Sequence, residues 1–340
     1  MIGARIHRTG GPDVLELEEV DEPEPGPGEI LVRVRATSVN HRDIWIRKGH
    51  PHPKYRVKMP AILGIDLCGD VVATGKGVGG FAVGGRVTVS PYLSCGLCEY
   101  CRRNRPQYCL DFDVYHGTYA EYAIVPASLA LNVSKDVPEE ALGCFSNSYI
   151  TAWQMLVAKC RVGPDDVVFV WGGTSGLGSA AVEIALLSGA RVIASAGSNE
   201  KLAVLAARGP EFVVNHYEPD MVARVLERTN GRGASIVVEH VGQATWGRSI
   251  ELCGSGATIV TAGATSGDDA AVNVTAMFVK QIRIVGSRLG TMDDAIAAVR
   301  HLETGRFKPL IGAVVPLSEI KEAHRLVESG SVIGKVVVKP

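Results

Sequence analysis

Four cysteines stand close together in one short segment, with the spacing Cys95-x2-Cys98-x2-Cys101-x7-Cys109. Thiolate sulfur is a preferred ligand of structural zinc, and short spacings let one loop supply all four corners of a tetrahedron. Four cysteines leave no open coordination position, so the spacing predicts one structural zinc per subunit in a lobe of about residues 92–112. Four free thiols are the alternative interpretation.

A glycine-rich loop is the second group of residues that could support a chemical function. It follows the apolar run Val167–Trp171 and precedes the helical pattern Ser179–Leu187. Glycines let backbone N–H groups approach a pyrophosphate at the positive end of a helix. The strand–loop–helix context therefore predicts dinucleotide binding, although a turn that only permits tight packing would look similar. The predicted cofactor-binding residues of the loop are Gly172, Gly173, Thr174, Ser175, Gly176, Leu177 and Gly178.

The segment after the next strand bears on the choice of cofactor. An acid at this place usually holds the ribose 2′-hydroxyl of NAD, but Ala194–Asn199 contains none. Small residues leave room for a 2′-phosphate, which Ser198 and Lys201 are expected to bind through a hydroxyl and a charge. His216 is expected to flank the adenine ribose. We therefore predict NADP(H), with NAD(H) less favoured; a solvated surface lysine is the alternative for Lys201.

Two different patterns position these groups. Up to about residue 125 the chain shows short strands, such as Ile30–Arg35, with glycine-rich turns and no amphipathic helix of ordinary length. From about residue 160, strands alternate with helices, which is typical of a doubly wound parallel sheet. The tail, Thr291–Pro340, shows two helical patterns and a final strand at Lys335–Lys339, and is expected to pack back on the first domain. The fold class is α/β, with a β-rich domain (1–148 and 288–340) and a dinucleotide-binding domain (149–287).

Composition limits the remaining possibilities. The formal net charge is -1, so net charge provides no long-range electrostatic attraction to nucleic acid or to an anionic membrane. No apolar run reaches the roughly 18 residues of a membrane helix, and the first residues lack the apolar core of a secretory signal. We expect a cytoplasmic protein without nucleic-acid or membrane partners. Thiols stay reduced there, which favours metal over disulfides at the cysteines.

The β-rich domain, the cysteine lobe, the glycine loop and the returning tail together resemble the medium-chain dehydrogenase/reductases, the superfamily of zinc-containing alcohol dehydrogenases and quinone oxidoreductases. The resemblance runs essentially from end to end. It implies a GroES-like catalytic domain plus a Rossmann domain. It also implies a homodimer or homotetramer, with dimers joined through a strand matching Ile282–Ser287.

Zinc-dependent members of this superfamily hold a second, catalytic zinc through Cys, His and Cys. The resemblance matches these three positions to Asn40, Ile65 and Asn147, which form a poor zinc shell. Cys144 is an alternative match for the last position. The resemblance therefore implies that the structural zinc is present and the catalytic zinc absent. A divergent ligand set of His41, Asp43 and Asp66 is the opposing interpretation.

Chemistry without a catalytic zinc favours an activated C=C bond, because the developing charge spreads into an enolate that neutral donors can hold. We hypothesise NADPH-dependent reduction of small carbonyl or alkene substrates: enones, quinones or enoyl thioesters. Asn40, His41 and Asp43 are the candidate catalytic residues, and the resemblance places Asn147 and Thr151 near the nicotinamide. The alternatives are an alcohol dehydrogenase or ketone reductase with a zinc-free or divergent site, and a non-catalytic dinucleotide-binding protein.

Overall fold

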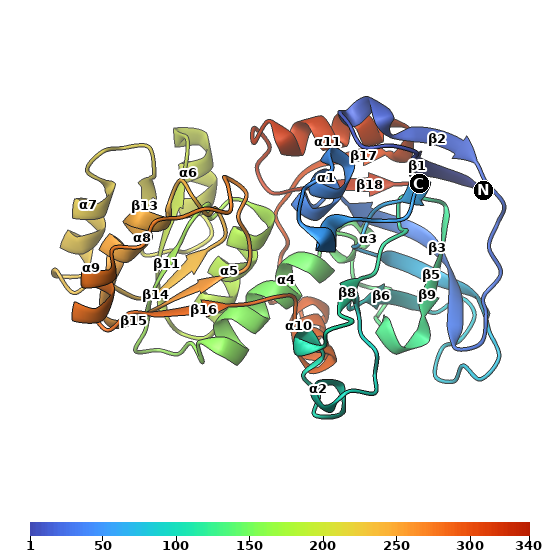
Figure 1. Cartoon of the computed structure of the whole chain (residues 1–340), viewed down its shortest axis with the longest axis horizontal. Helices are drawn as coiled ribbons and strands as arrows, with labels where there is room; N and C mark the ends of the chain where they lie inside the picture. Colours follow the sequence, from blue (N-terminus) through green and yellow to red (C-terminus); the bar gives the residue numbers. More distant parts are fainter. The chain divides into compact units, whose positions relative to one another are not determined.

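A computed structural model describes all residues, 1–340, and divides them into two compact units (Figure 1). The first unit comprises Met1–Ile150 and Gly290–Pro340, and the second comprises Thr151–Leu289. The C-terminal strand β18 (Lys335–Lys339) pairs with β3 (Glu29–Ser38), so the tail completes a sheet that begins near the N-terminus, as expected. No helix is long and apolar enough to cross a membrane.

The first unit is organised around β3, whose apolar run includes Ile30, Val32 and Val34. This strand pairs with β5, β9 and β18 in a seven-stranded sheet of order β10-β6-β5-β3-β18-β17, with β9 off this path. Side chains from β3, β5, β6 and β9 form one buried apolar core. The remaining strands of this unit are β1 (Ile2–Ile6), β2 (Glu16–Glu19), β4 (Ala61–Ile62), β5 (Cys68–Thr74), β6 (Arg86–Val89), β7 (Tyr92–Leu93), β8 (Asp113–Val114), β9 (Tyr122–Pro126), β10 (Ala130–Asn132) and β17 (Ile311–Pro316).

The first 125 residues were expected to hold no amphipathic helix of ordinary length, and the longest helix there is α1 (His41–Lys48), eight residues that follow β3 directly. The Asp43 carboxylate accepts from the backbone N–H of Asn40 at the start of the helix, and Gly49, with φ of 79°, ends it. The helix buries Asp43 and Arg47 as well as Ile44 and Ile46, so its buried face carries no clean apolar stripe. The other helices of this unit are α2 (Glu99–Arg102), α3 (Glu139–Leu142), α10 (Met292–Glu303) and α11 (Ile320–Glu328), and the chain leaves it within α4 (Ser146–Trp153).

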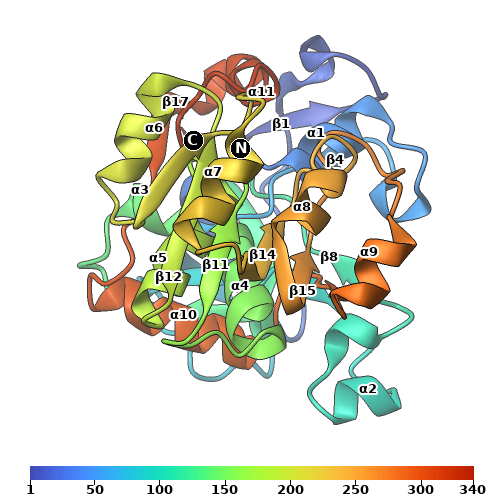
Figure 2. The ribbon, with the colours of Figure 1, turned by 90° about the vertical axis from the view of Figure 1, so that its left-hand side faces the viewer.

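The second unit is the doubly wound parallel sheet that the sequence predicts. Its strand order is β13-β12-β11-β14-β15-β16, and every neighbouring pair is parallel. Figure 2 labels β12, β11, β14 and β15 in this order. The order reverses between β11 and β14, and the glycine loop follows β11 at this switch point, where such sheets bind ligands. The strands are β11 (Val167–Val170), β12 (Arg191–Ala196), β13 (Phe212–Asn215), β14 (Ala234–Glu239), β15 (Cys253–Thr261) and β16 (Arg283–Gly286).

Helices cover both faces of this sheet because right-handed crossovers run in opposite directions from its centre. α5 and α6 connect β11 to β12 and β12 to β13, whereas α8 connects β14 to β15 in the other direction. Phe169, Trp171, Val237 and Ile259 from the sheet pack with Ile250 of α8 in the buried core. The helices are α5 (Gly176–Leu187), α6 (Asn199–Ala206), α7 (Met221–Arg228), α8 (Trp246–Leu252) and α9 (Val274–Val279), preceded by a π-helical segment at Gln154–Lys159.

Candidate active site and metal centre

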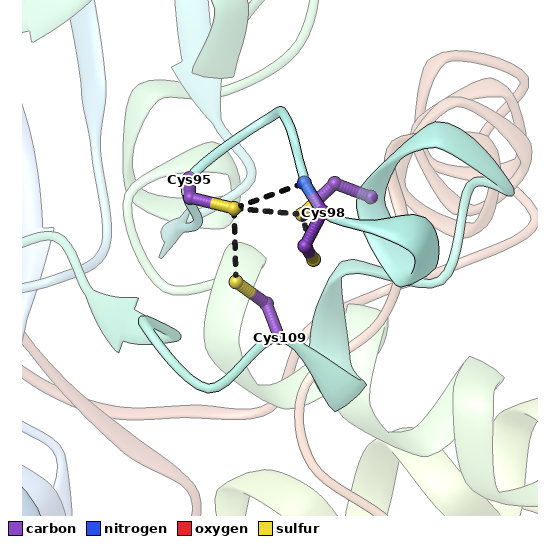
Figure 3. A group of neighbouring side chains, drawn as sticks. Cys95, Cys98 and Cys109 are labelled. Carbon is purple, nitrogen blue, oxygen red and sulfur yellow. Dashed lines mark hydrogen bonds between the residues drawn. The ribbon is translucent and has the colours of Figure 1, made fainter.

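The four cysteines of the lobe converge, as Figure 3 shows for Cys95, Cys98 and Cys109. All four sulfur atoms lie within 4.8 Å of one another, and no disulfide joins them. The Sγ atoms of Cys98 and Cys101 are 3.5 Å apart, as are those of Cys109 and Cys95. A zinc–sulfur bond of about 2.3 Å requires sulfur atoms about 3.8 Å apart in a tetrahedron, so the four residues fit a zinc ion.

The backbone around the lobe favours the metal-binding form of the thiols. N–H groups of Leu97 and Cys98 point at the sulfur of Cys95 and lower its pKa to about 6. Zinc binds the thiolate, so this environment prepares the site before any metal arrives. The lobe is tied to α10 by a hydrogen bond of 2.6 Å from Asn104 Nδ2 to Asp293 Oδ2. Four sulfur atoms would fill all four positions of a tetrahedral zinc ion, which fits a structural ion rather than a catalytic one.

The three positions matched to catalytic zinc ligands contain a different arrangement. Ile65 is fully buried and offers no ligand atom. Asn147 Nδ2 donates to Asn40 Oδ1 at 2.9 Å, so the two amides bind each other. Neutral amides and an aliphatic side chain do not provide the thiolate and imidazole ligands that zinc prefers, and these residues do not fit a catalytic zinc.

A buried ion pair supports the two asparagines. Lys335 Nζ lies 3.2 Å from Asp66 Oδ2, and donates to Asn40 Oδ1 at 2.6 Å and to the Val39 carbonyl at 3.2 Å. Asp66 Oδ2 also accepts from Ser38 Oγ at 2.5 Å, and its Oδ1 accepts from the backbone N–H of Asn147 at 2.7 Å. We call Ser38, Asn40, Asp66, Asn147 and Lys335 the amide network. Its members come from β3, the segments after β3 and β4, the start of α4, and β18.

Sequence reasoning identified the two asparagines but missed Ser38 and Lys335, and it considered Asp66 only as a metal ligand. Lys335 is separated from Asn40 by 295 residues and reaches it only because β18 pairs with β3. The signal in the sequence was a lysine at the start of the apolar strand Val336–Val338, since such a position is expected to be buried.

The other two candidate catalytic residues have different surroundings. Asp43 is fully buried, and its carboxylate accepts from the N–H groups of Asn40 and Gly64 and from the Tyr119 hydroxyl. Burial raises its pKa to about 6, against the lowering effect of these three donors. His41 is exposed, with its ring 6.2 Å from that of Trp45. Asp43 thus fixes the start of α1 and the turn at Gly64.

The divergent metal set of His41, Asp43 and Asp66 is not assembled. The only groups of at least three His, Cys, Asp or Glu residues with ligand atoms within 4.8 Å of one another are the cysteine lobe and an exposed cluster of His7, Glu16 and Glu18. Cys144, the alternative match for a catalytic ligand, is fully buried, and burial raises the pKa of its thiol to about 12. It is therefore a protonated thiol rather than a prepared zinc ligand.

The glycine loop of the second unit has the shape of a phosphate-binding turn. Gly172 adopts a positive φ of 52°, and a Cβ on Gly178 would lie 2.1 Å from the carbonyl oxygen of Gly172. Ser175 caps α5, its hydroxyl accepting from the N–H of Gly178 at 3.0 Å. The N–H groups of Gly176 and Leu177 belong to the first turn, which has no intrahelical acceptors for them. They fit a pyrophosphate at the positive end of the helix.

Basic groups gather where β12 and β13 end. The positive charges of Lys201 and Arg248, after burial, lower the pKa of His216, so both cations lie near that ring. Arg248 donates to the carbonyl of His216 at 2.7 Å, and the Ser198 hydroxyl caps α6. A Cβ on Gly197 would lie 2.8 Å from Tyr217 Cε2 and 3.0 Å from His216 Nε2, so the two rings crowd this position and would have to shift for a larger side chain. Arg248 was not anticipated from the sequence, because it lies far along the chain on α8.

Thr151, the last predicted cofactor residue, is buried in α4, four residues after Asn147. Positions four apart lie on the same side of a helix. Asn147 is half-buried and belongs to the amide network, whereas Thr151 begins the second unit.

Known proteins resemble the whole chain. Residues 26–135 match the family described as "Alcohol dehydrogenase GroES-like domain", and residues 176–304 match "Zinc-binding dehydrogenase". An alcohol dehydrogenase of Schizosaccharomyces pombe is 31% identical over 99% of this chain and 97% of that protein. Acryloyl-coenzyme A reductase of Sulfurisphaera tokodaii is 27% identical, with 96% of each protein covered. A crystal structure of an NAD-dependent alcohol dehydrogenase has a TM-score of 0.96 at 40% identity and covers 100% of both chains.

The chain belongs to the medium-chain dehydrogenase/reductase superfamily, among the zinc-containing alcohol dehydrogenases and their relatives. The expected fold, a GroES-like domain with a Rossmann domain, is confirmed. Membership makes it an oxidoreductase, and the cysteine cluster and the dehydrogenase family support zinc and a nicotinamide dinucleotide as its cofactors.

Proposed function

We propose that this protein is an NADP(H)-dependent oxidoreductase that reduces an activated C=C bond or a quinone without a catalytic zinc. The observation that carries the proposal is the amide network. At the three positions that the resemblance matches to catalytic zinc ligands stand Asn40, Ile65 and Asn147, and the two asparagines are held by the buried Lys335–Asp66 pair. This arrangement offers an amide hydrogen-bond donor in place of a Lewis acid.

The chemistry of an enone matches this environment. A dinucleotide held at the glycine loop would supply the hydride for the β-carbon, and the electrons of the C=C bond would move toward the carbonyl oxygen. The amide network offers a neutral donor for the oxygen of such an enolate, whose charge is spread over several atoms. Protonation of the α-carbon then completes the reduction, with the proton drawn from solvent. A simple ketone concentrates the charge on one oxygen, which a metal ion stabilises better.

The basic groups after β12 and β13 support NADP(H) as the cofactor. Lys201 and Arg248 lie near His216, and the residues directly after β12, Gly197, Ser198 and Asn199, include no acid. The similar crystal structure is that of an NAD-dependent enzyme, so the choice needs a direct test. Lys201→Ala should weaken NADPH binding about fivefold, since one partly exposed charge contributes about 1 kcal/mol, and should leave NADH binding unchanged. Equal effects on both dinucleotides, measured by fluorescence titration, would exclude a phosphate contact.

The exposed edge of the second unit supports a homo-oligomer. Strand β16 ends the six-stranded sheet, and Val274, Phe278 and Val279 of the preceding α9 are 67%, 65% and 63% exposed. An unpaired edge strand beside apolar side chains is a template for pairing with a second copy. Phe278→Asp should lower the mass measured by light scattering to that of the monomer. An unchanged oligomer would place the interface elsewhere.

Oxidation of an alcohol is the second candidate, because relatives covering the whole chain are alcohol dehydrogenases. Two measurements on one preparation separate the candidates. The first is zinc per subunit after purification without chelator, and the second is turnover of an enone, a quinone and a secondary alcohol. One zinc with enone or quinone reduction is expected. Two zincs with alcohol oxidation would establish the alcohol dehydrogenase, and tight dinucleotide binding without any turnover would indicate a non-catalytic protein.

A further inference from the structure

The amide network fixes which end of each asparagine faces its neighbour. A lysine ammonium can only donate hydrogen bonds, and an ionised carboxylate can only accept them. Lys335 Nζ therefore faces Asn40 Oδ1 at 2.6 Å, and Asp66 Oδ2 faces Asn40 Nδ2 at 2.9 Å. Because Asn40 presents its oxygen to Asn147, Asn147 must present its NH2 group, as the 2.9 Å contact shows.

Asn40 has no hydrogen-bonding capacity left for a substrate. Its two amide hydrogens go to Asp66 Oδ2 and to the Ser38 carbonyl, and its oxygen accepts from Lys335 and Asn147. Its side chain is also buried, with the residue only 4% exposed. Lys335 is saturated too, because its three hydrogens match three acceptors, on Val39, Asn40 and Asp66.

Asn147 differs from both. It is half-buried, and only one hydrogen of its NH2 group is used, in the bond to Asn40. Its backbone N–H is held by Asp66 Oδ1 at 2.7 Å, which fixes the first turn of α4 and the base of the side chain. The second amide hydrogen is therefore a neutral donor with a fixed direction, at the boundary between the buried network and the exterior.

We propose that Asn147 Nδ2 donates a hydrogen bond to the substrate oxygen that gains charge during hydride transfer, and that Asn40, Asp66 and Lys335 are positioning residues for this donor. The inference rests on the proposed function, and it assigns to Asn147 the contact that the sequence alone suggested for Asn40. A donor held in advance stabilises developing charge without having to reorient during the reaction. No proton leaves the amide, so the step requires no acid at this position.

The first test is Asn147→Ala in the full-length holoenzyme, with cyclohexenone as the probe. Removing one preorganised donor should lower kcat about 100-fold. NADPH affinity should stay unchanged. The matched control is Asn132→Ala, which removes an exposed asparagine whose Nδ2 donates to the Gly80 carbonyl. A kcat within about threefold of wild type would overturn the proposal, as would a loss confined to NADPH affinity, which would make Asn147 a cofactor residue.

The second test asks whether Lys335 acts through Asn147. Lys335→Met should lower kcat in the wild-type background but have little further effect in the Asn147→Ala background, since the donor it orients is then gone. Lys335→Arg keeps a cation that can only donate hydrogen bonds, so it should restore part of the activity. This result would distinguish a loss of Asn147 orientation from a failure of the variant to fold. Multiplicative losses in the double variant would show that Lys335 acts independently of Asn147.

A measurement that requires no turnover tests the role of Asn147 independently of the proposed function. In the complex with NADP⁺ and cyclohexenone carrying an isotope-labelled carbonyl, the infrared C=O stretch should lie lower in wild type than in Asn147→Ala. If wild type oxidises alcohols and reduces no enone, the proposed function fails, and the stretch still decides the role of Asn147. Identical stretches in the two proteins would overturn the inference whatever the reaction.

Discussion

The first unit contains two polar centres, the cysteine lobe and the amide network. They hold their charged or polar groups in different ways. The lobe brings four sulfur atoms within 4.8 Å of one another from a single segment of 15 residues, Cys95–Cys109. The amide network draws on five residues spread from Ser38 to Lys335 and buries a lysine–carboxylate pair among them. The lobe is incomplete without a metal, whereas the network satisfies its own charges.

The two centres show how one fold can hold polar groups with and without a metal ion. A cluster of thiols has no internal counter-charge, so its stability depends on a cation. In the amide network Lys335 supplies the positive charge and Asp66 the negative charge, and the asparagines connect them. A metal ion placed there would meet an ammonium group already in position. Three variants or treatments test this contrast, in order of expected effect.

The largest effect is expected at the lobe. Cys109→Ala removes one of four ligands, and zinc should fall from one per subunit to a trace. Structural zinc contributes roughly 10–16 kcal/mol of apparent binding free energy in small zinc domains, so losing it should unfold the lobe. Elemental analysis and limited proteolysis within residues 92–112 measure the two consequences.

The matched control is Cys144→Ala, because Cys144 is buried beside the amide network rather than in the lobe. Zinc content should not change in this variant. Retention of zinc in Cys109→Ala, or its loss in Cys144→Ala, would reverse the assignment of the two centres.

The contrast also explains what could be predicted from the sequence. The four cysteines and the glycine loop are local motifs whose spacing carries their geometry, so both were identified before the structure. The amide network is non-local: Asn40, Asp66 and Asn147 were noticed only through the resemblance to zinc ligands, and Lys335 was missed because no periodicity encodes the pairing of β18 with β3. Helix α1 was missed for a related reason, since its buried face includes Asp43 and Arg47.

The next effect concerns the ion pair of the network. Lys335→Met leaves the fully buried Asp66 without its cation and should lower the free energy of unfolding by about 3–5 kcal/mol. Asp66 retains hydrogen bonds from Ser38, Asn40 and the N–H of Asn147. We therefore expect the loss in the free energy of unfolding to lie toward the lower end of this range. Urea denaturation followed by circular dichroism gives the value.

The double variant Lys335→Met/Asp66→Asn is the control, because it removes both charges together. It should recover part of the lost stability, since a neutral amide costs less to bury than an unpaired carboxylate. A double variant whose loss of stability equals the sum of the losses in Lys335→Met and Asp66→Asn would mean that the two charges do not depend on each other.

The smallest effect lies beside the network, at the buried carboxyl of Asp43, whose pKa burial raises from 3.8 to about 6. The folded protein therefore binds a proton more tightly than the unfolded chain, and the stability this provides below pH 3.8 is lost as the pH rises to about 6. Compared with Asp43→Asn, which does not titrate, wild type should lose about 3 kcal/mol of unfolding free energy across this window, at 1.36 kcal/mol per pKa unit. Urea unfolding of both proteins at a series of pH values measures the difference, and zinc loss at low pH affects both alike. Tyr119→Phe removes a donor that lowers the Asp43 pKa, so the pH range over which wild type loses this stability should move to higher pH. A difference that stays flat would show that burial does not raise the pKa of Asp43, and one that grows in favour of wild type as the pH rises would show that the pKa is lowered in the folded protein.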